Sequence, residues 1–141
     1  MNCPNCNVHI DKHVASRCFD AWVAVDVMGH SDIRKREQVV GGYDSWRYCL
    51  YTGDCHESYG VNCFFSTSIA AAWVVHQKAC SLLFSKRREY LRQLCYSVSA
   101  RVLNKDASFS TLARIKWPDV MVFLEPVDFC RAAIITFLKS E

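Results

Sequence analysis

The N-terminus carries the residues with the clearest chemical potential. Cys3 and Cys6 flank Pro4 in a Cys-x-x-Cys pair. Two thiolates at this spacing can reach one metal ion from a single tight turn, and a tetrahedral zinc site then needs two further ligands. His13 and Cys18 supply them at a spacing close to that of a compact zinc knuckle, with a slightly longer middle loop. The sequence therefore predicts one structural zinc ion held by Cys3, Cys6, His13 and Cys18.

Three other interpretations of this segment stay open. His9 is a rival third ligand, because it would close a tighter turn after Cys6. The cysteines could also be reduced thiols beside two exposed histidines. A redox pair is the third interpretation, but a redox Cys-x-x-Cys normally follows a strand and begins a helix. Nothing resembling a strand precedes Cys3.

No catalytic centre is indicated elsewhere in the sequence. Cys55 and His56 are adjacent, yet neighbours on an extended segment point to opposite faces and make a poor dyad. Together with Cys49 and Cys63 they could form a second metal site, although their spacing is irregular. No phosphate-binding glycine motif or His-Glu-x-x-His helix is present. Four nitrogen and sulfur ligands leave no open position on zinc, so we expect no enzyme and no catalytic residues.

Composition and charge define the class of protein. The chain has 141 residues, of which 51% are hydrophobic and 22% charged, as expected of one globular domain spanning 1–141. Residues 1–18 would form the zinc knuckle that leads into the first helix. Nine cysteines, an odd number, argue against a disulfide scaffold. Neither a signal peptide nor a membrane span is visible, so we expect a reducing cytosol and no membrane partner. The net charge of +3 permits an acidic or nucleic-acid partner without requiring one.

Helical periodicity alternates with short strand-like segments. The apolar spacing predicts helices over 17–29, about 69–83 and about 85–103, and a last helix from Pro126 to the C-terminus. Alternating or continuous apolar segments predict strands at 45–52, 112–115 and 120–124. The expected fold class is α+β, an α/β sandwich of three to four helices packed on a small β-sheet. Trp22, Trp73 and Phe129 should meet in its core, because each lies on the apolar face of a different helix.

Two regions are candidates for partner binding. Four cations crowd the start of the 85–103 helix, where they repel one another and oppose the helix dipole, so folding alone does not favour them. They are expected to be exposed, with Tyr90 beside them: Lys86, Arg87, Arg88 and Arg92. The irregular 43–64 segment offers a second surface rich in aromatic side chains, with Trp46, Tyr48 and Tyr51.

Three stretches of the chain, 13–29, 65–75 and 125–133, resemble the phage ABA sandwich domain proteins, which bacteriophages and prophages encode. The resemblance covers the two ends and the middle of the chain; 31–64 and 84–117 match poorly. It implies an α/β sandwich and a phage origin. Members often carry an N-terminal Cys-Pro-x-Cys, which Cys3, Pro4 and Cys6 match. The family brings no catalytic signature.

We therefore expect a small phage-encoded, non-enzymatic binding protein in the cytoplasm of an infected bacterial host. It would block a host protein, as an inhibitor of a bacterial defence system such as an anti-CRISPR or a related anti-defence protein. The alternative is a zinc-knuckle accessory protein that binds nucleic acid. The sequence leaves open the target and whether the protein self-associates.

Overall fold

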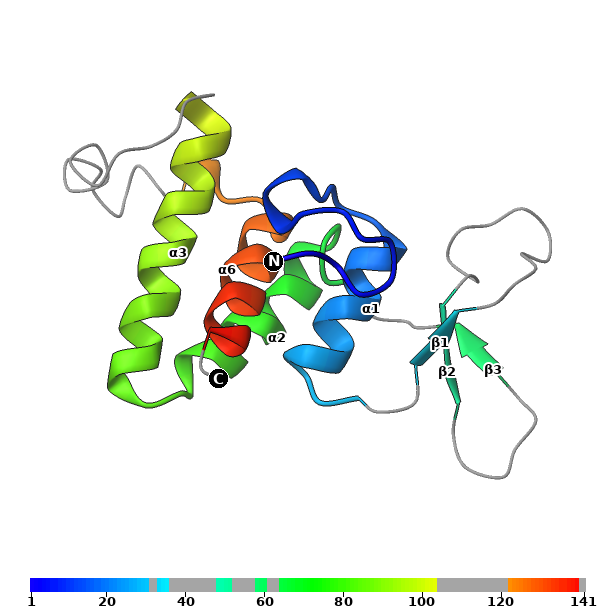
Figure 1. The fold of residues 1–141 in the computed structure, drawn as a ribbon. Coiled ribbons are helices and arrows are strands. Elements are labelled where there is room, and N and C mark those ends of the chain that lie inside the picture. The colour runs from blue at the N-terminus through cyan, green and yellow to red at the C-terminus, as the bar shows by residue number, and fades with distance from the viewer. Residues whose placement is uncertain (31–32, 36–47, 52–57, 61–63, 104–121, 140–141) are drawn as a thin grey trace.

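The computed structural model describes residues 1–30, 33–35, 48–51, 58–60, 64–103 and 122–139. Helices dominate this part of the chain (Figure 1). They are the 3-10 helix η1 (Ile10–Lys12) and the α-helices α1 (Arg17–Asp26), α2 (Ile69–Cys80), α3 (Phe84–Leu103) and α6 (Pro126–Leu138). None of these helices combines the length and the apolar character that crossing a bilayer requires.

The helices begin where the sequence supplies caps. The side chain of Ser68 accepts the backbone N–H of Ala71 at the start of α2. At α6 a capping box joins Glu125 and Asp128, and Pro126 occupies the first helical position, where its missing N–H costs nothing. The predicted positions of all four α-helices are thereby confirmed to within a few residues.

Helix α6 is the centre of the described core. It is buried on nearly all sides and packs against α1, α2 and α3. Trp22 on α1 and Phe129 on α6 are both almost fully buried, as predicted. Small, fully buried side chains let the backbones of α2 and α6 approach closely. They are Ala72 and Ala79 on α2 and Ala132 on α6.

The strands lie beside the helices and do not form a layer beneath them. β1 (Ile33–Lys35), β2 (Tyr48–Tyr51) and β3 (Ser58–Gly60) pair antiparallel in the order β1-β2-β3. Arg34 is opposite Cys49, and Leu50 is opposite Tyr59. The sheet contacts α1 at the edge of the molecule (Figure 1). The predicted α/β sandwich is therefore wrong, because α6 and not a sheet is the surface on which the described helices pack.

Four more predictions need correction or lie outside the described residues. Trp73 is 46% exposed, because α2 turns Ala72 and Val75 toward α6 instead. Tyr90 is buried in the core and does not lie among the exposed cations. Residues 122–123, predicted to belong to a strand, are helical, while the strand predicted at 112–115 lies outside the described residues.

Candidate metal centre

The four predicted ligands come together on one side of α1. The ligand atoms of Cys3, Cys6, His13 and Cys18 all lie within 4.8 Å of one another. The Sγ atoms of Cys3 and Cys18 are 3.6 Å apart, and the Sγ of Cys6 lies 3.2 Å from Nε2 of His13. In a tetrahedral site with metal–sulfur bonds of about 2.3 Å, two sulfurs are about 3.8 Å apart. The cluster therefore has the dimensions needed to bind one metal ion.

A tight turn presents the first two cysteines. Asn7 donates its backbone N–H to the carbonyl of Cys3 at 2.8 Å, and Cys3 donates to the carbonyl of Val8 at 2.9 Å. This turn requires one residue in the left-handed conformation. Asn7 adopts that conformation with φ of 61°, which asparagine tolerates better than most residues. Burial raises the pKa of the Cys3 thiol, while hydrogen bonds from the backbone of Asn5 and Cys6 act in the opposite direction. The same backbone N–H groups would stabilise a metal-bound thiolate.

His13 is held in the orientation that a ligand needs. Its Nδ1 lies 3.0 Å from the carbonyl oxygen of Val14, which can only accept, so Nδ1 carries the proton. The lone pair is then on Nε2, the atom that faces Cys6. The imidazole also stacks on Phe19, with ring centroids 4.7 Å apart. A hydrogen bond from the distal ring nitrogen is the usual support of a metal-bound histidine, since it fixes both the tautomer and the orientation of the ring.

The fourth ligand comes from the start of α1. Ser16 caps this helix by accepting the backbone N–H of Phe19 at 3.2 Å, and Cys18 follows in the first turn. The cap is tied to the beginning of α2, because Ser16 donates its N–H to the hydroxyl of Ser66 at 3.1 Å. The buried carboxylate of Asp20 accepts both the hydroxyl and the backbone N–H of Ser66 at 2.7 Å. Cys18 is therefore placed by a helix whose first turn is fixed to the core.

Arg131 on α6 is a supporting residue that the sequence analysis missed. Its guanidinium donates to the carbonyl of Ile10 at 3.1 Å and to the carbonyl of His13 at 2.9 Å. It also donates to the hydroxyl of Ser97 at 3.2 Å. Burial lowers the pKa of Arg131, and the nearby carboxylate of Asp128 opposes that shift. One side chain of the central helix thus fixes the backbone on both sides of η1, and with it the position of His13.

His9, the rival ligand, lies outside the cluster. Its Nε2 is 3.1 Å from the terminal amine of Met1, and its Nδ1 is 3.4 Å from a carboxylate oxygen of Asp11. Both ring nitrogens therefore face partners other than the thiols. The spacing of the sequence allowed either histidine, and the geometry selects His13 because η1 separates the two and turns His9 outward.

The remaining predicted site residues have different outcomes. Lys86, Arg87, Arg88 and Arg92 are exposed on α3, as predicted, and Arg92 is paired with Glu89. Tyr48 and Tyr51 lie in β2, whereas Trp46 lies outside the described residues. Of the second cysteine–histidine set, Cys55, His56 and Cys63 are also outside them, and only the backbone of Cys49 is described. The second metal site stays a prediction.

No protein-family model, curated protein or solved structure was found to match this chain. The resemblance to the phage ABA sandwich proteins is therefore neither supported nor opposed by these comparisons, although the sandwich fold that it implied is not what the described residues form. The functional interpretation depends on the geometry of the chain itself.

Proposed function

We propose that this chain is a non-enzymatic binding protein whose N-terminal segment is fixed to its helical core by one structural zinc ion. The observation that carries the proposal is the convergence of Cys3, Cys6, His13 and Cys18 within 4.8 Å. Three thiolates and one imidazole form a donor set typical of structural zinc and unlike the oxygen-rich sites of magnesium or calcium.

The donor set supports a structural role over a catalytic one. A catalytic zinc usually has three protein ligands and keeps the fourth position for water or substrate, whereas this cluster supplies all four ligands. Cys3 and His13 are buried and Cys18 is half-buried, so the coordination sphere would face solvent mainly on the side of the exposed Cys6. Zinc here would connect the N-terminal turn, η1 and the start of α1.

Elemental analysis of the purified protein tests this proposal, and we expect one zinc per chain. Cobalt exchanged into the site should give the visible absorption of tetrahedral, thiolate-bound cobalt. His13→Ala should lose the metal, and His9→Ala should retain it. Cys95→Ser provides a matched control for removal of a thiol, because Cys95 lies on α3 away from the cluster.

Two results would contradict the proposal. Purified protein without bound metal, after expression in zinc-supplied medium, would leave the cluster as a group of reduced thiols. Loss of metal from His9→Ala, with retention in His13→Ala, would mean that the ligand set is wrong while a metal centre remains.

The identity of the partner rests on the sequence resemblance alone. Inhibition of a bacterial defence complex, by occupying a host protein, remains our proposal for the biological role, with nucleic-acid binding as the alternative. Pull-down from a susceptible bacterial lysate, followed by mass spectrometry, tests both. A defence protein recovered at stoichiometric level supports the first role, and recovery of nucleic acid that nuclease treatment removes supports the second.

A further inference from the structure

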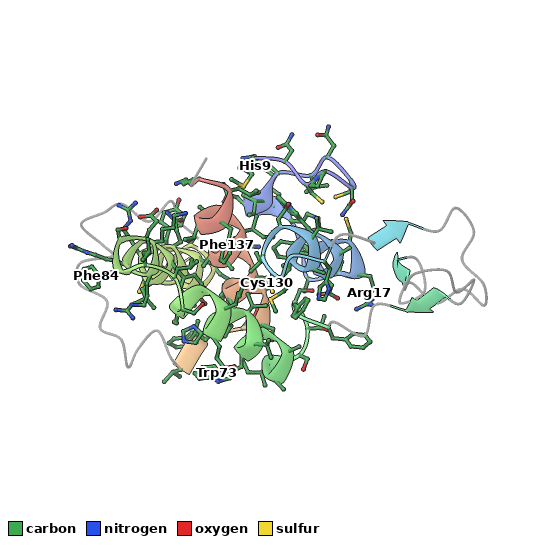
Figure 2. The ribbon with its side chains drawn as sticks, turned by 90° about the horizontal axis from the view of Figure 1, so that it is seen from below. His9, Arg17, Trp73, Phe84, Cys130 and Phe137 are labelled. Carbon is green, nitrogen blue, oxygen red and sulfur yellow. The ribbon has the colours of Figure 1, made fainter. Side chains whose placement is uncertain are left out.

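The corner between α2 and α3 exposes two adjacent apolar side chains. Leu83 is 78% exposed and Phe84 is 70% exposed, although the connection between two helices is normally polar. Figure 2 shows Phe84 at the outer edge of the molecule, directed away from the helices. We name the segment from Leu83 to Arg88 the α2–α3 corner. Burial against the core does not explain these two apolar side chains, because most of the surface of each is exposed.

Three exposed cations follow directly. Lys86, Arg87 and Arg88 occupy the beginning of α3, where no acidic residue is present in the first turn. The guanidinium of Arg87 lies over the ring of Phe84, 5.6 Å from its centroid. Charge and apolar surface are therefore interleaved at the α2–α3 corner and do not form separate patches.

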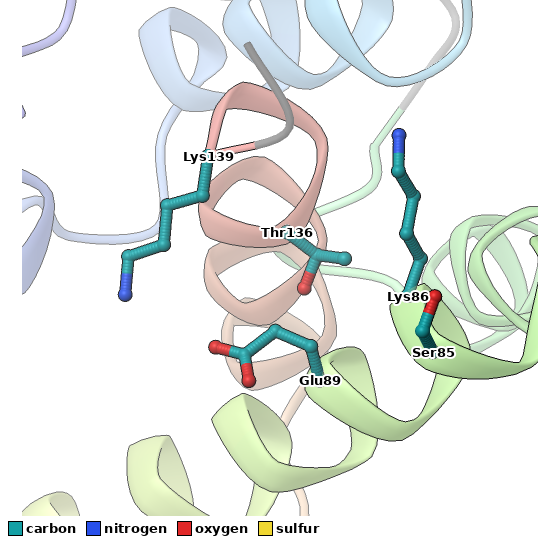
Figure 3. A pocket seen from close by; sticks show the side chains of 5 residues that line it. All are labelled: Ser85, Lys86, Glu89, Thr136 and Lys139. Atoms are coloured by element: carbon teal, nitrogen blue, oxygen red, sulfur yellow. The ribbon is translucent and has the colours of Figure 1, made fainter.

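A shallow hollow lies next to this corner, between α3 and α6. Its volume is about 270 Å³, and its lining residues are Ser85, Lys86, Glu89, Thr136 and Lys139. In Figure 3, Glu89 and Thr136 lie between the two lysines. The carboxylate of Glu89 accepts a hydrogen bond from the side-chain amide of Gln93 at 2.7 Å. It also forms an ion pair with Arg92, which compensates its negative charge. The two lysines add positive charge at the rim of the hollow, with their amino groups directed away from each other (Figure 3).

We propose that the α2–α3 corner docks on the surface of a membrane that contains anionic phospholipid. Leu83 and Phe84 would enter the boundary between headgroups and acyl chains, and the three cations would contact lipid phosphates. Binding of this kind is peripheral and reversible, and it does not depend on the metal centre.

Nucleic acid is the other anionic partner to consider, and the corner fits it less well. Phe84 could stack on a base, but the more exposed side chain is Leu83, which has no π-face for stacking. Two adjacent apolar side chains on a projecting corner are better suited to insertion between lipid headgroups than to stacking on the bases of a single-stranded nucleic acid. The sequence alone predicted no membrane partner; the exposure of Leu83 and Phe84 is the observation that changes this.

Co-sedimentation with vesicles tests the proposal. The full chain should bind vesicles of equal parts phosphatidylcholine and phosphatidylglycerol, and should not bind vesicles of phosphatidylcholine alone. Raising the salt concentration should weaken binding, because exposed charges are screened. The variant Lys86→Gln/Arg87→Gln/Arg88→Gln should bind about a hundredfold more weakly at low salt. Leu83→Ser/Phe84→Ser should reduce the affinity for anionic vesicles by at least about tenfold at every salt concentration.

A matched control separates this surface from exposed apolar side chains in general. Val14 and Val122 are also strongly exposed, and Val14→Ser/Val122→Ser should bind anionic vesicles as the unmodified chain does. Circular dichroism should show all variants folded, since every changed side chain is exposed.

Equal binding to neutral and anionic vesicles would overturn the proposal, and so would full binding by Leu83→Ser/Phe84→Ser. A third contrary result is tight binding to a single-stranded oligonucleotide with no binding to anionic vesicles. If that binding required the cations but neither Leu83 nor Phe84, the surface would belong to nucleic acid.

Discussion

The metal centre and the α2–α3 corner each bring together side chains that could bind something. At the metal centre these side chains face one another, whereas at the α2–α3 corner they face solvent. At the metal centre, Cys3, Cys6, His13 and Cys18 face one another, and the surrounding backbone is hydrogen-bonded to the core. At the α2–α3 corner Phe84 points away from the helices (Figure 2), and most of the surface of both Leu83 and Phe84 is exposed. Side chains that face one another, as the four metal ligands do, indicate a structural role within the molecule. Side chains that face solvent, as at the α2–α3 corner, indicate a role in binding a partner.

This difference separates the measurements that should respond. Changes at the metal centre should alter metal content and the order of the N-terminal segment, with effects on stability. Changes at the α2–α3 corner should alter binding and leave stability nearly constant. Metal removal and substitutions in the core should therefore change stability far more than substitutions at the α2–α3 corner.

Removal of the metal should have the largest effect, confined to one region. The apparent free energy of zinc binding to zinc-finger peptides is about 10–16 kcal/mol at neutral pH. With a strong chelator, the backbone amides of Cys3, Asn7 and Ile10 should exchange with deuterium much faster. The amides of α6 should stay protected, because its packing against α1, α2 and α3 does not use the metal. Equal loss of protection in α6 would show that the core and the metal centre unfold together.

Two tryptophans offer the next largest contrast. Trp22 is 1% exposed, so Trp22→Ala should lower the free energy of unfolding by about 3–5 kcal/mol. Trp73 is half exposed, stacks on His76 and meets the edge of Phe129, so Trp73→Ala should cost only about 1–2 kcal/mol. Urea denaturation measures both. Equal losses would mean that another surface covers Trp73 in solution.

These residues also show how far the sequence could predict the structure. The metal ligands lie within the first 18 residues, so local spacing and a few turns bring them together, and their identity was predictable. Arg131 was not, because it reaches His13 across 118 residues of chain, a contact that only the packing of α6 creates. The caps of Ser68 and Pro126 gave the helix starts for the same local reason.

The errors come from choices that local pattern does not determine. The α2 sequence is apolar around most of its circumference, so periodicity could not show that Ala72 and Val75, and not Trp73, face the core. Strand chemistry at 48–51 did predict β2 correctly. It could not show whether the sheet lies under the helices or at their edge, because that depends on which surfaces pack together. Small residues on α2 and α6 favour direct contact between helices.

Arg131 should have an intermediate effect that links the core to the metal. Arg131→Met keeps much of the apolar stem but removes the donors to Ile10, His13 and Ser97. We expect a loss of about 2–3 kcal/mol in stability and about tenfold in metal affinity, typical of residues that support a ligand. Competition with a chromophoric chelator measures the affinity. Unchanged metal affinity alongside lower stability would show that Arg131 supports the fold only.

A pH dependence should come from His76, the half-buried histidine of α2. Burial lowers its pKa from the ordinary value of 6.5, and its ring contacts Tyr90, Cys80 and Phe129. The unfolded chain therefore binds this proton more readily, so stability is lost as the pH falls below 6.5 toward the folded pKa. His76→Gln should show a shallower loss over that interval in urea denaturation. Parallel curves for the two proteins would remove His76 as the cause.

The smallest effect on folding is expected at the α2–α3 corner itself. Lys86→Gln/Arg87→Gln/Arg88→Gln removes three cations that repel one another beside a helix N-terminus, where positive charge is unfavourable by about 0.3–1 kcal/mol each. The contact of Arg87 with Phe84 is lost at the same time, at a cost of about 0.5–1 kcal/mol for an exposed pair. These contributions nearly cancel, so the free energy of unfolding should stay constant or rise slightly at low salt. A loss above about 2 kcal/mol would mean that the cations stabilise the fold. The α2–α3 corner would then contribute to stability as the metal centre does, and the exposure of its side chains would no longer indicate a role in binding.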